Sequence, residues 1–168
     1  MTLDEAMYKR RSVRAFLEKE VEEEKIQKLL EYAMAGPSAC NSRPWEFYVV
    51  KSAENRSKLR KTSRHTDFNS PVIVIVAANE KFMLAGERRD FWIQDCSAAV
   101  ENILLGATAL GLGSCWCGVY PKTEAVENMR SFLGLDTSIY PLALIHIGYP
   151  AQSPEPRTQF DQSRVHIL

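Results

Sequence analysis

The sequence predicts one globular domain that combines helices and strands around a single core, and three observations predict it. Its 168 residues are 45% hydrophobic and 25% charged, which is ordinary for one domain. Residues 90–112 form a long, weakly amphipathic stretch, which predicts a helix buried on nearly all sides. Residues 72–78 and 141–148 are apolar on both faces, which predicts strands inside a sheet.

The net charge, the N-terminal residues and the longest apolar stretch give no reason to expect nucleic-acid or membrane partners. The chain carries 21 basic and 21 acidic residues, so its net charge gives no reason to expect binding to nucleic acid or a membrane surface. The acidic, polar start Met1–Glu5 is unlike a secretory signal. Glu101 and Asn102 interrupt the best candidate for the roughly 18 apolar residues of a membrane span. We therefore expect a cytoplasmic protein with no nucleic-acid or membrane partner.

The four cysteines predict neither a metal site nor structural disulfides. Cys115 and Cys117 stand closer together than the ligand pairs of zinc sites, and no second pair matches them. An intracellular setting also disfavours disulfides. We expect the Cys115 and Cys117 side chains to point to opposite faces of an extended segment, so that packing, rather than electron relay, is their role.

A basic segment follows the first helix. If residues 10–16 are extended, alternation places Arg10, Ser12 and Arg14 on one face. Two guanidiniums that flank a hydroxyl suit a phosphate dianion, because arginine offers paired donors and stays charged. The alternative is a solvated basic patch.

The other elements follow from apolar spacing, capping residues and glycine or proline breaks. The predicted helices run from Leu3 to Lys9 or Arg10 behind a Thr2/Glu5 capping box, from Glu22 to Ala35, from Glu54 to Lys61, and from a Thr123 cap to Leu133 before Gly134. The predicted extended segments are Phe47 to Lys51 and Cys115 to Val119, with a polar connection from Arg64 to Ser70. Residues 79–89 are poorly periodic, as lids often are.

Two loops and one histidine stand out within this frame. Pro37 to Phe47 is a loop of small polar residues that leads into a strand, and small residues let a backbone approach a ligand closely. Gly111 and Gly113 stop the buried helix and leave the next backbone free to approach a flat group. His146 lies inside a predicted strand, where a hydrogen-bonded core or interface histidine is the expected role.

Four stretches in combination resemble the nitroreductase family of FMN-dependent oxidoreductases. They are residues 10–16, residues 37–47, residues 109–116, and Gly148-Tyr149-Pro150 together with Arg164-Val165-His166. They occur in the family's order, and they span nearly the whole chain. The sequence is therefore similar to the short members of the family, with a single FMN-binding domain over residues 1–168.

The resemblance implies an α+β fold with three layers, in which helices flank a mainly antiparallel central sheet. It also implies an obligate, intertwined homodimer with two FMN sites at the interface. Residues 150–168 are rich in proline and glutamine and hold too little apolar surface for a core of their own. We expect this tail to be disordered or to pack on the partner subunit.

Carried over by position, five basic and hydroxyl residues are implied at the phosphate and pyrimidine ends of FMN. Arg10 and Ser12 hold the phosphate, with Arg11 beside them and Arg157 reaching it from the tail. Arg14 lies near the pyrimidine, where its positive charge stabilises the anionic reduced flavin.

The ring and the ribityl chain are implied to lie between two loops. The partner subunit contributes Pro37, Ser38, Ala39 and Asn41. The subunit that carries the basic segment contributes Cys115, Trp116, Cys117 and Gly118. The backbone N–H groups of Cys117 and Gly118 are implied to face flavin N5. The chain departs from the family at Arg43, where many members have glutamine, and at Gln159, where they have a second basic residue.

The implied activity is an FMN-dependent NAD(P)H oxidoreductase that reduces nitroaromatic, quinone or similar small acceptors. NADH or NADPH donates hydride to flavin N5 in a ping-pong sequence, so no side chain is needed as a catalytic acid or base. Two alternatives stay open. One is a flavoenzyme of the same fold with dehydrogenase, dehalogenase or flavin-fragmenting chemistry, and the other is a flavin-binding dimer without turnover.

Overall fold

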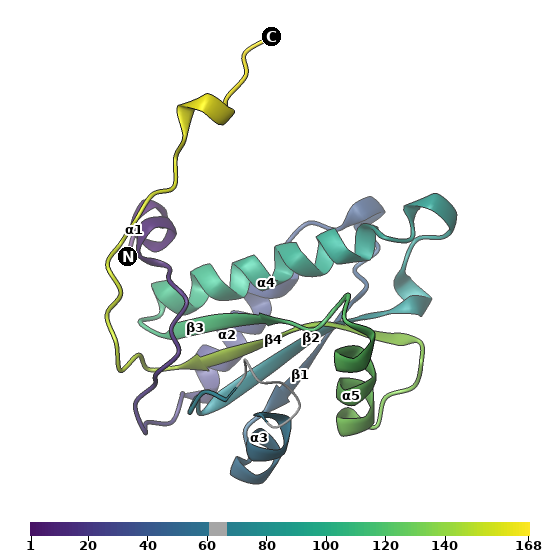
Figure 1. The fold of residues 1–168 in the computed structure, drawn as a ribbon, viewed down its shortest axis with the longest axis horizontal. Coiled ribbons are helices and arrows are strands. Elements are labelled where there is room, and N and C mark those ends of the chain that lie inside the picture. The colour runs from purple at the N-terminus through teal and green to yellow at the C-terminus, as the bar shows by residue number, and fades with distance from the viewer. Residues whose placement is uncertain (61–66) are drawn as a thin grey trace.

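The computed structural model describes residues 1–60 and 67–168, and it is a three-layer α+β fold (Figure 1). The helices are α1 Leu3–Lys9, α2 Glu23–Met34, α3 Ala53–Arg60, α4 Phe91–Ala109 and α5 Thr123–Leu133. The strands are β1 Trp45–Val50, β2 Val72–Asn79, β3 Gly113–Gly118 and β4 Ile139–Gly148. Short 3-10 turns occur at Ala39–Asn41, Glu80–Phe82, Gly86–Arg88 and Gln162–Arg164.

The four strands form one antiparallel sheet in the order β1-β2-β4-β3. The two central strands are those predicted from runs that are apolar on both faces, and both are buried along almost their whole length. This confirms the α+β fold with its mainly antiparallel sheet. β3 is an edge strand, which leaves one of its sides open to other groups.

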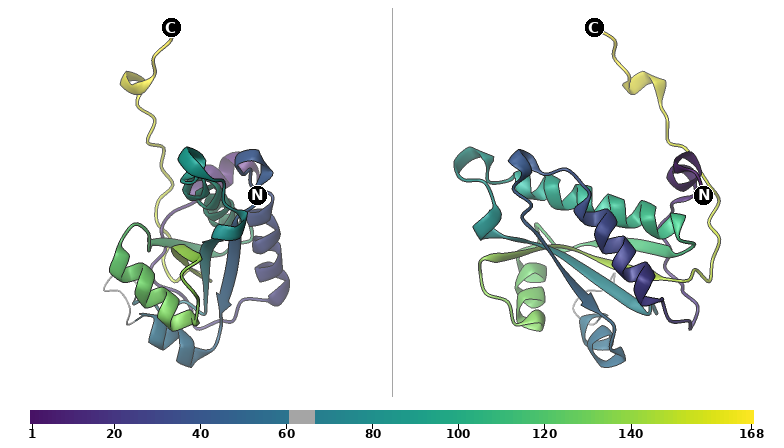
Figure 2. Two further views of the ribbon diagram at one scale, coloured as in Figure 1. Left: turned by 90° about the vertical axis from the view of Figure 1, so that its right-hand side faces the viewer. Right: turned by 180° about the vertical axis from the view of Figure 1, so that it is seen from behind.

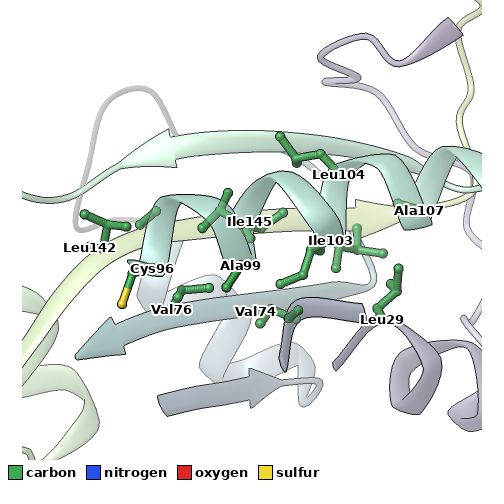
Figure 3. Close-up of a cluster of buried hydrophobic side chains, with 14 of the residues drawn as sticks. Leu29, Val74, Val76, Cys96, Ala99, Ile103, Leu104, Ala107, Leu142 and Ile145 are labelled. Carbon is green, nitrogen blue, oxygen red and sulfur yellow. The ribbon is translucent and has the colours of Figure 1, made fainter. Parts of the chain in front are cut away.

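Alternate residues of β2 separate the core into two layers. Val74 and Val76 face α2 and α4 (Figure 3), whereas Ile73 and Ile75 belong to a second cluster with residues of α3 and α5. Helices therefore cover both faces of the sheet, as Figure 2 shows. Burial on both sides explains why β2 consists almost entirely of valine, isoleucine and alanine.

The long helix α4 is the buried helix that the sequence predicts, because side chains such as Cys96, Ala99 and Ile103 have no exposed surface. Its predicted C-terminal end at Leu112 is wrong. The helix ends at Ala109, and Gly111 follows with φ +74°. The Leu112 N–H donates to the Ala107 carbonyl at 2.8 Å, which is the bond that closes a Schellman motif. Neither α4 nor any other helix in the described part of the chain is long and apolar enough to span a bilayer.

Other boundaries shift by one to three residues. The Thr2/Glu5 capping box is confirmed, but Thr123 is the first residue of α5, and the cap position is Lys122 with no side-chain bond. β1 begins at Trp45, two residues before the prediction, because its ladder with β2 extends to the Trp45–Ala78 pair. Lys61 and residues 64–66 of the predicted polar connection lie outside the described residues.

The C-terminal tail leaves the body of the molecule. After Pro150 the chain runs past α1 and projects away from it (Figures 1 and 2). The side chains of Phe160 and Ile167 are 72% and 93% exposed. The tail thus has no core of its own within this chain, as its composition predicts.

Candidate functional site

The outer edge of β3 is lined by the basic segment, residues 10–16. Ser12 forms a parallel bridge with Ser114, and the Val13 N–H donates to the Ser114 carbonyl at 2.9 Å. The Val13 side chain also occupies the space above Gly113, where an added Cβ would lie 2.8 Å from Val13 Cγ1. Gly113 is therefore required, because the segment approaches β3 so closely that a side chain at this position would meet Val13.

Asn69 fixes the far end of the same segment. The Phe16 N–H donates to Asn69 Oδ1 at 3.0 Å, and Asn69 Nδ2 donates to the Phe16 carbonyl at 2.7 Å. The segment is thus held at both ends, although it lies outside the four-stranded sheet. The role of Asn69 was not predictable from the sequence, because a polar residue in a loop carries no signal for a partner 53 positions away.

Three arginines leave this fixed segment within five residues. Arg10 Nε lies 3.6 Å from Glu101 Oε1 of α4. Arg11 Nη1 donates to the Glu155 carbonyl of the tail, and the Arg14 side chain is exposed. The tail stays close at this point, because the Arg157 N–H donates to the carbonyl of Tyr8 at 3.3 Å.

Cys115 and Cys117 lie on one face of β3, so the expectation of opposite faces was wrong. Side chains of a strand alternate, and residues i and i+2 therefore share a face. The two cysteines pair with His146 and Leu144 of β4, which are also two residues apart. Cys115 Sγ lies 4.0 Å from the Trp116 carbonyl oxygen. Cys115 is buried and Cys117 is partly exposed.

The two thiols differ in acidity. The neighbouring Cys117 thiol, the Arg14 charge and the Ser12 hydroxyl together lower the pKa of Cys115 to about 7, against the opposing effect of burial. The Cys115 thiol and burial raise the pKa of Cys117. Arg14 and Ser12 therefore act on the same point of β3.

The C-terminal end of β3 leaves room above its backbone. Trp116 is 37% exposed, and Gly118 is exposed. A Cβ added at Gly118 would meet no atom within 4 Å. Unlike Gly113, this glycine is not required by packing within the chain, which leaves space for a ligand to approach the backbone.

The loop of small residues has a strained backbone. Cys40, Asn41 and Arg43 adopt φ angles of 52°, 53° and 50°. Left-handed non-glycine residues cost roughly 1–3 kcal/mol each and concentrate at functional sites, where the surrounding structure enforces them. Here the Arg43 N–H donates to Ser38 Oγ at 3.0 Å.

Asp95 of α4 holds this loop in place. The Ala39 N–H donates to Asp95 Oδ1 at 2.8 Å, and Ser42 Oγ lies 3.4 Å from Asp95 Oδ2. Only 5% of Asp95 is exposed. Asp95 was not among the predicted site residues, although an acidic residue inside an otherwise apolar helix is a usable signal for a buried polar contact.

Within one chain, the two predicted halves of the site lie apart. Asp95 fixes Pro37, Ser38, Ala39 and Asn41 near the start of α4, whereas the basic segment borders β3, the strand that follows the end of that helix. Figure 2 shows the loop and α1 at opposite ends of α4. The structure therefore places Arg10, Arg11, Ser12 and Arg14 along the edge of β3 and bonds the backbone of Arg157 to α1, whereas Asp95 holds residues 37–41 near the start of α4.

Comparison with known proteins shows to which family this chain belongs. The sequence profile of the nitroreductase family matches residues 7–66 and 60–149, which include the basic segment, the strained loop and β3. The chain belongs to the nitroreductase family. This confirms the resemblance seen in the sequence.

Several relatives match this chain over nearly its full length. A Methanothermobacter thermautotrophicus protein named "Putative NADH dehydrogenase/NAD(P)H nitroreductase" is 41% identical over 170 residues, 99% of this chain and 87% of its own. A Clostridium acetobutylicum structure described as a "Putative NADH Oxidase" has a TM-score of 0.91 at 39% identity, covering 96% of this chain and 98% of its own. An FMN-dependent nitroreductase from Clostridium difficile has a TM-score of 0.86 at 31% identity, covering 96% of each chain.

One buried histidine lies in β4, next to β3. His146 is fully buried in β4, with Nδ1 2.6 Å from Ser70 Oγ and the ring of Phe68 at its edge. Burial and, to a smaller extent, the Arg60 charge lower its pKa to about 4. The predicted core histidine is confirmed. Across residues 1–60 and 67–168, no three His, Cys, Asp or Glu side chains are grouped to hold a metal ion.

Proposed function

We propose that this chain is an FMN-dependent NAD(P)H oxidoreductase that reduces nitroaromatic, quinone or similar small acceptors. Family membership and the names of the relatives support the oxidoreductase class and the nucleotide donor. The observation that carries the proposal furthest is the fixed basic segment beside the open edge of β3.

The basic segment fits the phosphate of FMN. Arg10, Arg11 and Ser12 supply guanidinium and hydroxyl donors from consecutive positions, and the bridge to Ser114 holds their backbone in place. Such charge-assisted bonds suit a phosphate dianion. Arg157 joins them from the tail, whose backbone is bonded to α1 at that residue.

The edge of β3 fits the flavin ring. Gly118 leaves its backbone open, Cys117 precedes it, and Arg14 brings a positive charge to the same strand. When bound, the flavin supplies the hydride chemistry between donor and acceptor. The residues of the chain orient the ring, and Arg14 offsets the negative charge that a reduced ring carries.

We propose that two copies of the chain complete each site. The loop of Pro37, Ser38, Ala39 and Asn41 is shaped and fixed, yet it lies away from the basic segment of its own chain. The partner's copy of this loop would close the site over the ring. The exposed apolar residues of the tail, such as Phe160 and Ile167, would pack on the partner subunit.

The phosphate assignment is tested by measuring FMN affinity of the wild type, Arg10→Ala and Ser12→Ala, with Lys28→Ala as a control at an exposed cation on α2. Loss of a charge-assisted bond costs about 1.5–3 kcal/mol, so Arg10→Ala is expected to weaken binding by roughly 10- to 150-fold. Equal affinity in Arg10→Ala, Ser12→Ala and wild type would overturn the assignment.

A further inference from the structure

We propose that Glu101 of α4 is a positioning residue for the phosphate of FMN. It holds the Arg10 guanidinium by its Nε edge and leaves the two Nη groups free to bind the phosphate. The inference rests on the proposed function, which assigns the phosphate to Arg10. It gives a role to an acidic residue that lies outside the proposed set of FMN contacts.

Arg10 is held at both ends of the residue. Its backbone N–H donates to the Ala6 carbonyl at 2.9 Å, at the C-terminal cap of α1. At the end of the side chain, Nε lies 3.6 Å from Glu101 Oε1, and 31% of the Arg10 side chain is exposed. A long side chain that is free to sample many rotamers loses that freedom when it binds a ligand, which weakens the affinity. An arginine that is already held has less freedom to lose.

The contact at Nε leaves the phosphate-binding edge of Arg10 unoccupied. A guanidinium carries N–H donors on Nε and on both Nη groups, and the paired Nη donors match two oxygens of a phosphate. Within residues 1–60 and 67–168, neither Nη group of Arg10 has a hydrogen-bond acceptor. Arg11 differs, because its Nη1 already donates to the Glu155 carbonyl. Arg10 therefore combines a held guanidinium with a free pair of donors.

Glu101 is carried by a helix that is itself firmly packed. The nearby Ile103 side chain has no exposed surface. Asn102 Nδ2 donates to the Tyr32 carbonyl at 2.9 Å, which joins α4 to α2 at this point. The helix α1, which Arg10 caps, packs on α4 as well (Figure 1). The carboxylate and the start of the basic segment are therefore held in fixed relative positions.

The Glu101 carboxylate has two opposing effects on a bound phosphate. Its negative charge repels the phosphate, which weakens FMN binding. Its contact with Nε orients Arg10, which strengthens FMN binding. We expect orientation to outweigh repulsion, because the carboxylate contacts Arg10 directly and the phosphate binds at a different edge of the guanidinium. Glutamine separates the two effects, since it keeps an acceptor oxygen and carries no charge.

Titration of the full-length protein with FMN and with riboflavin, which lacks the phosphate, tests the inference. Glu101→Ala is expected to weaken FMN binding about three- to tenfold, the factor by which ordering one long side chain lowers affinity, and to leave riboflavin binding unchanged. Glu101→Gln should restore most of the FMN affinity. Glu24→Ala, at an exposed acidic residue of α2, is the control and should match the wild type. An FMN affinity that is unchanged or higher in Glu101→Ala, or an equal loss for both flavins, would overturn the inference.

A double-mutant cycle shows whether Glu101 acts through Arg10. In the Arg10→Ala background, Glu101→Ala is expected to cause no further loss of FMN affinity, because no guanidinium remains to be oriented. An equal loss in both backgrounds would contradict the inference and leave the proposed function intact. A wild-type protein that binds neither flavin would instead refute the proposed function, and that result is known before any variant is measured.

Discussion

At the scale of single residues, side-chain hydrogen bonds to the backbone hold the loop and the basic segment in place. Asp95 joins α4 to the strained loop, and Asn69 joins the basic segment to the connection before β2. Neither residue belongs to the proposed set of FMN contacts. Each of them holds in place a backbone segment whose other residues are proposed FMN contacts.

Removing the Asp95 carboxylate is expected to loosen the loop. Asp95→Ala leaves the Ala39 N–H without its acceptor, and a lost hydrogen bond to a charged group costs about 1.5–3 kcal/mol. FMN affinity should fall about tenfold or more, because the loop must be reordered on binding. Asp95→Asn keeps an acceptor oxygen and serves as the control, and isothermal titration of both variants measures the effect. Unchanged affinity in Asp95→Ala would show that the loop is not part of the site.

His146 is expected to make stability pH-dependent. Its folded pKa of about 4 lies below the ordinary value of 6.5, so the unfolded chain binds a proton that the folded chain does not. The contribution is complete above pH 6.5 and is lost as the pH falls toward 4, at about 1.4 kcal/mol per pH unit. Urea unfolding at pH 7 and pH 4.5 should show a loss of about 2–3 kcal/mol. His146→Asn, which retains a partner for Ser70, should lack this component.

At the scale of elements, two glycines of β3 have different roles. The space above Gly113 is filled by Val13 of the basic segment, whereas the space above Gly118 is open. Gly113 therefore allows the basic segment to pack on β3, whereas Gly118 leaves space for a ligand to approach the backbone of β3.

Alanine at each of these glycines separates stability from binding. Gly113→Ala forces Val13 away and is expected to lower the free energy of unfolding by about 1–3 kcal/mol, and to weaken FMN binding with it. Gly118→Ala should change stability by less than about 0.5 kcal/mol, yet weaken FMN binding. Thermal unfolding and flavin titration measure both. An unchanged FMN affinity in Gly118→Ala would place the ring elsewhere.

Patterns within one element were predictable, and contacts between distant elements were not. The buried strands and α4 follow from apolar runs, but the end of α4 does not, because Leu110 and Leu112 continue the apolar pattern beyond the backbone signal at Gly111. The basic segment was located, since its alternation is local. The role of Asp95 depends on a loop more than 50 positions away, and no spacing rule identifies it.

At the scale of the whole molecule, one chain leaves its tail exposed and its two half-sites apart. A homodimer would resolve both features. Deleting residues 157–168 removes Arg157 and the exposed apolar tail, so weaker FMN binding and a less stable dimer are expected. Analytical ultracentrifugation across a concentration series measures the dimer, with wild type as reference. A monomeric wild type that still binds FMN tightly would contradict the two-chain site.

The central claim is that this chain binds a flavin and reduces it with a pyridine nucleotide. The most direct test is an absorbance spectrum of the purified protein, followed by anaerobic addition of NADH and then NADPH. The account predicts a yellow protein whose flavin absorbance bleaches with at least one of the two donors. A colourless protein that added FMN does not reconstitute would contradict it.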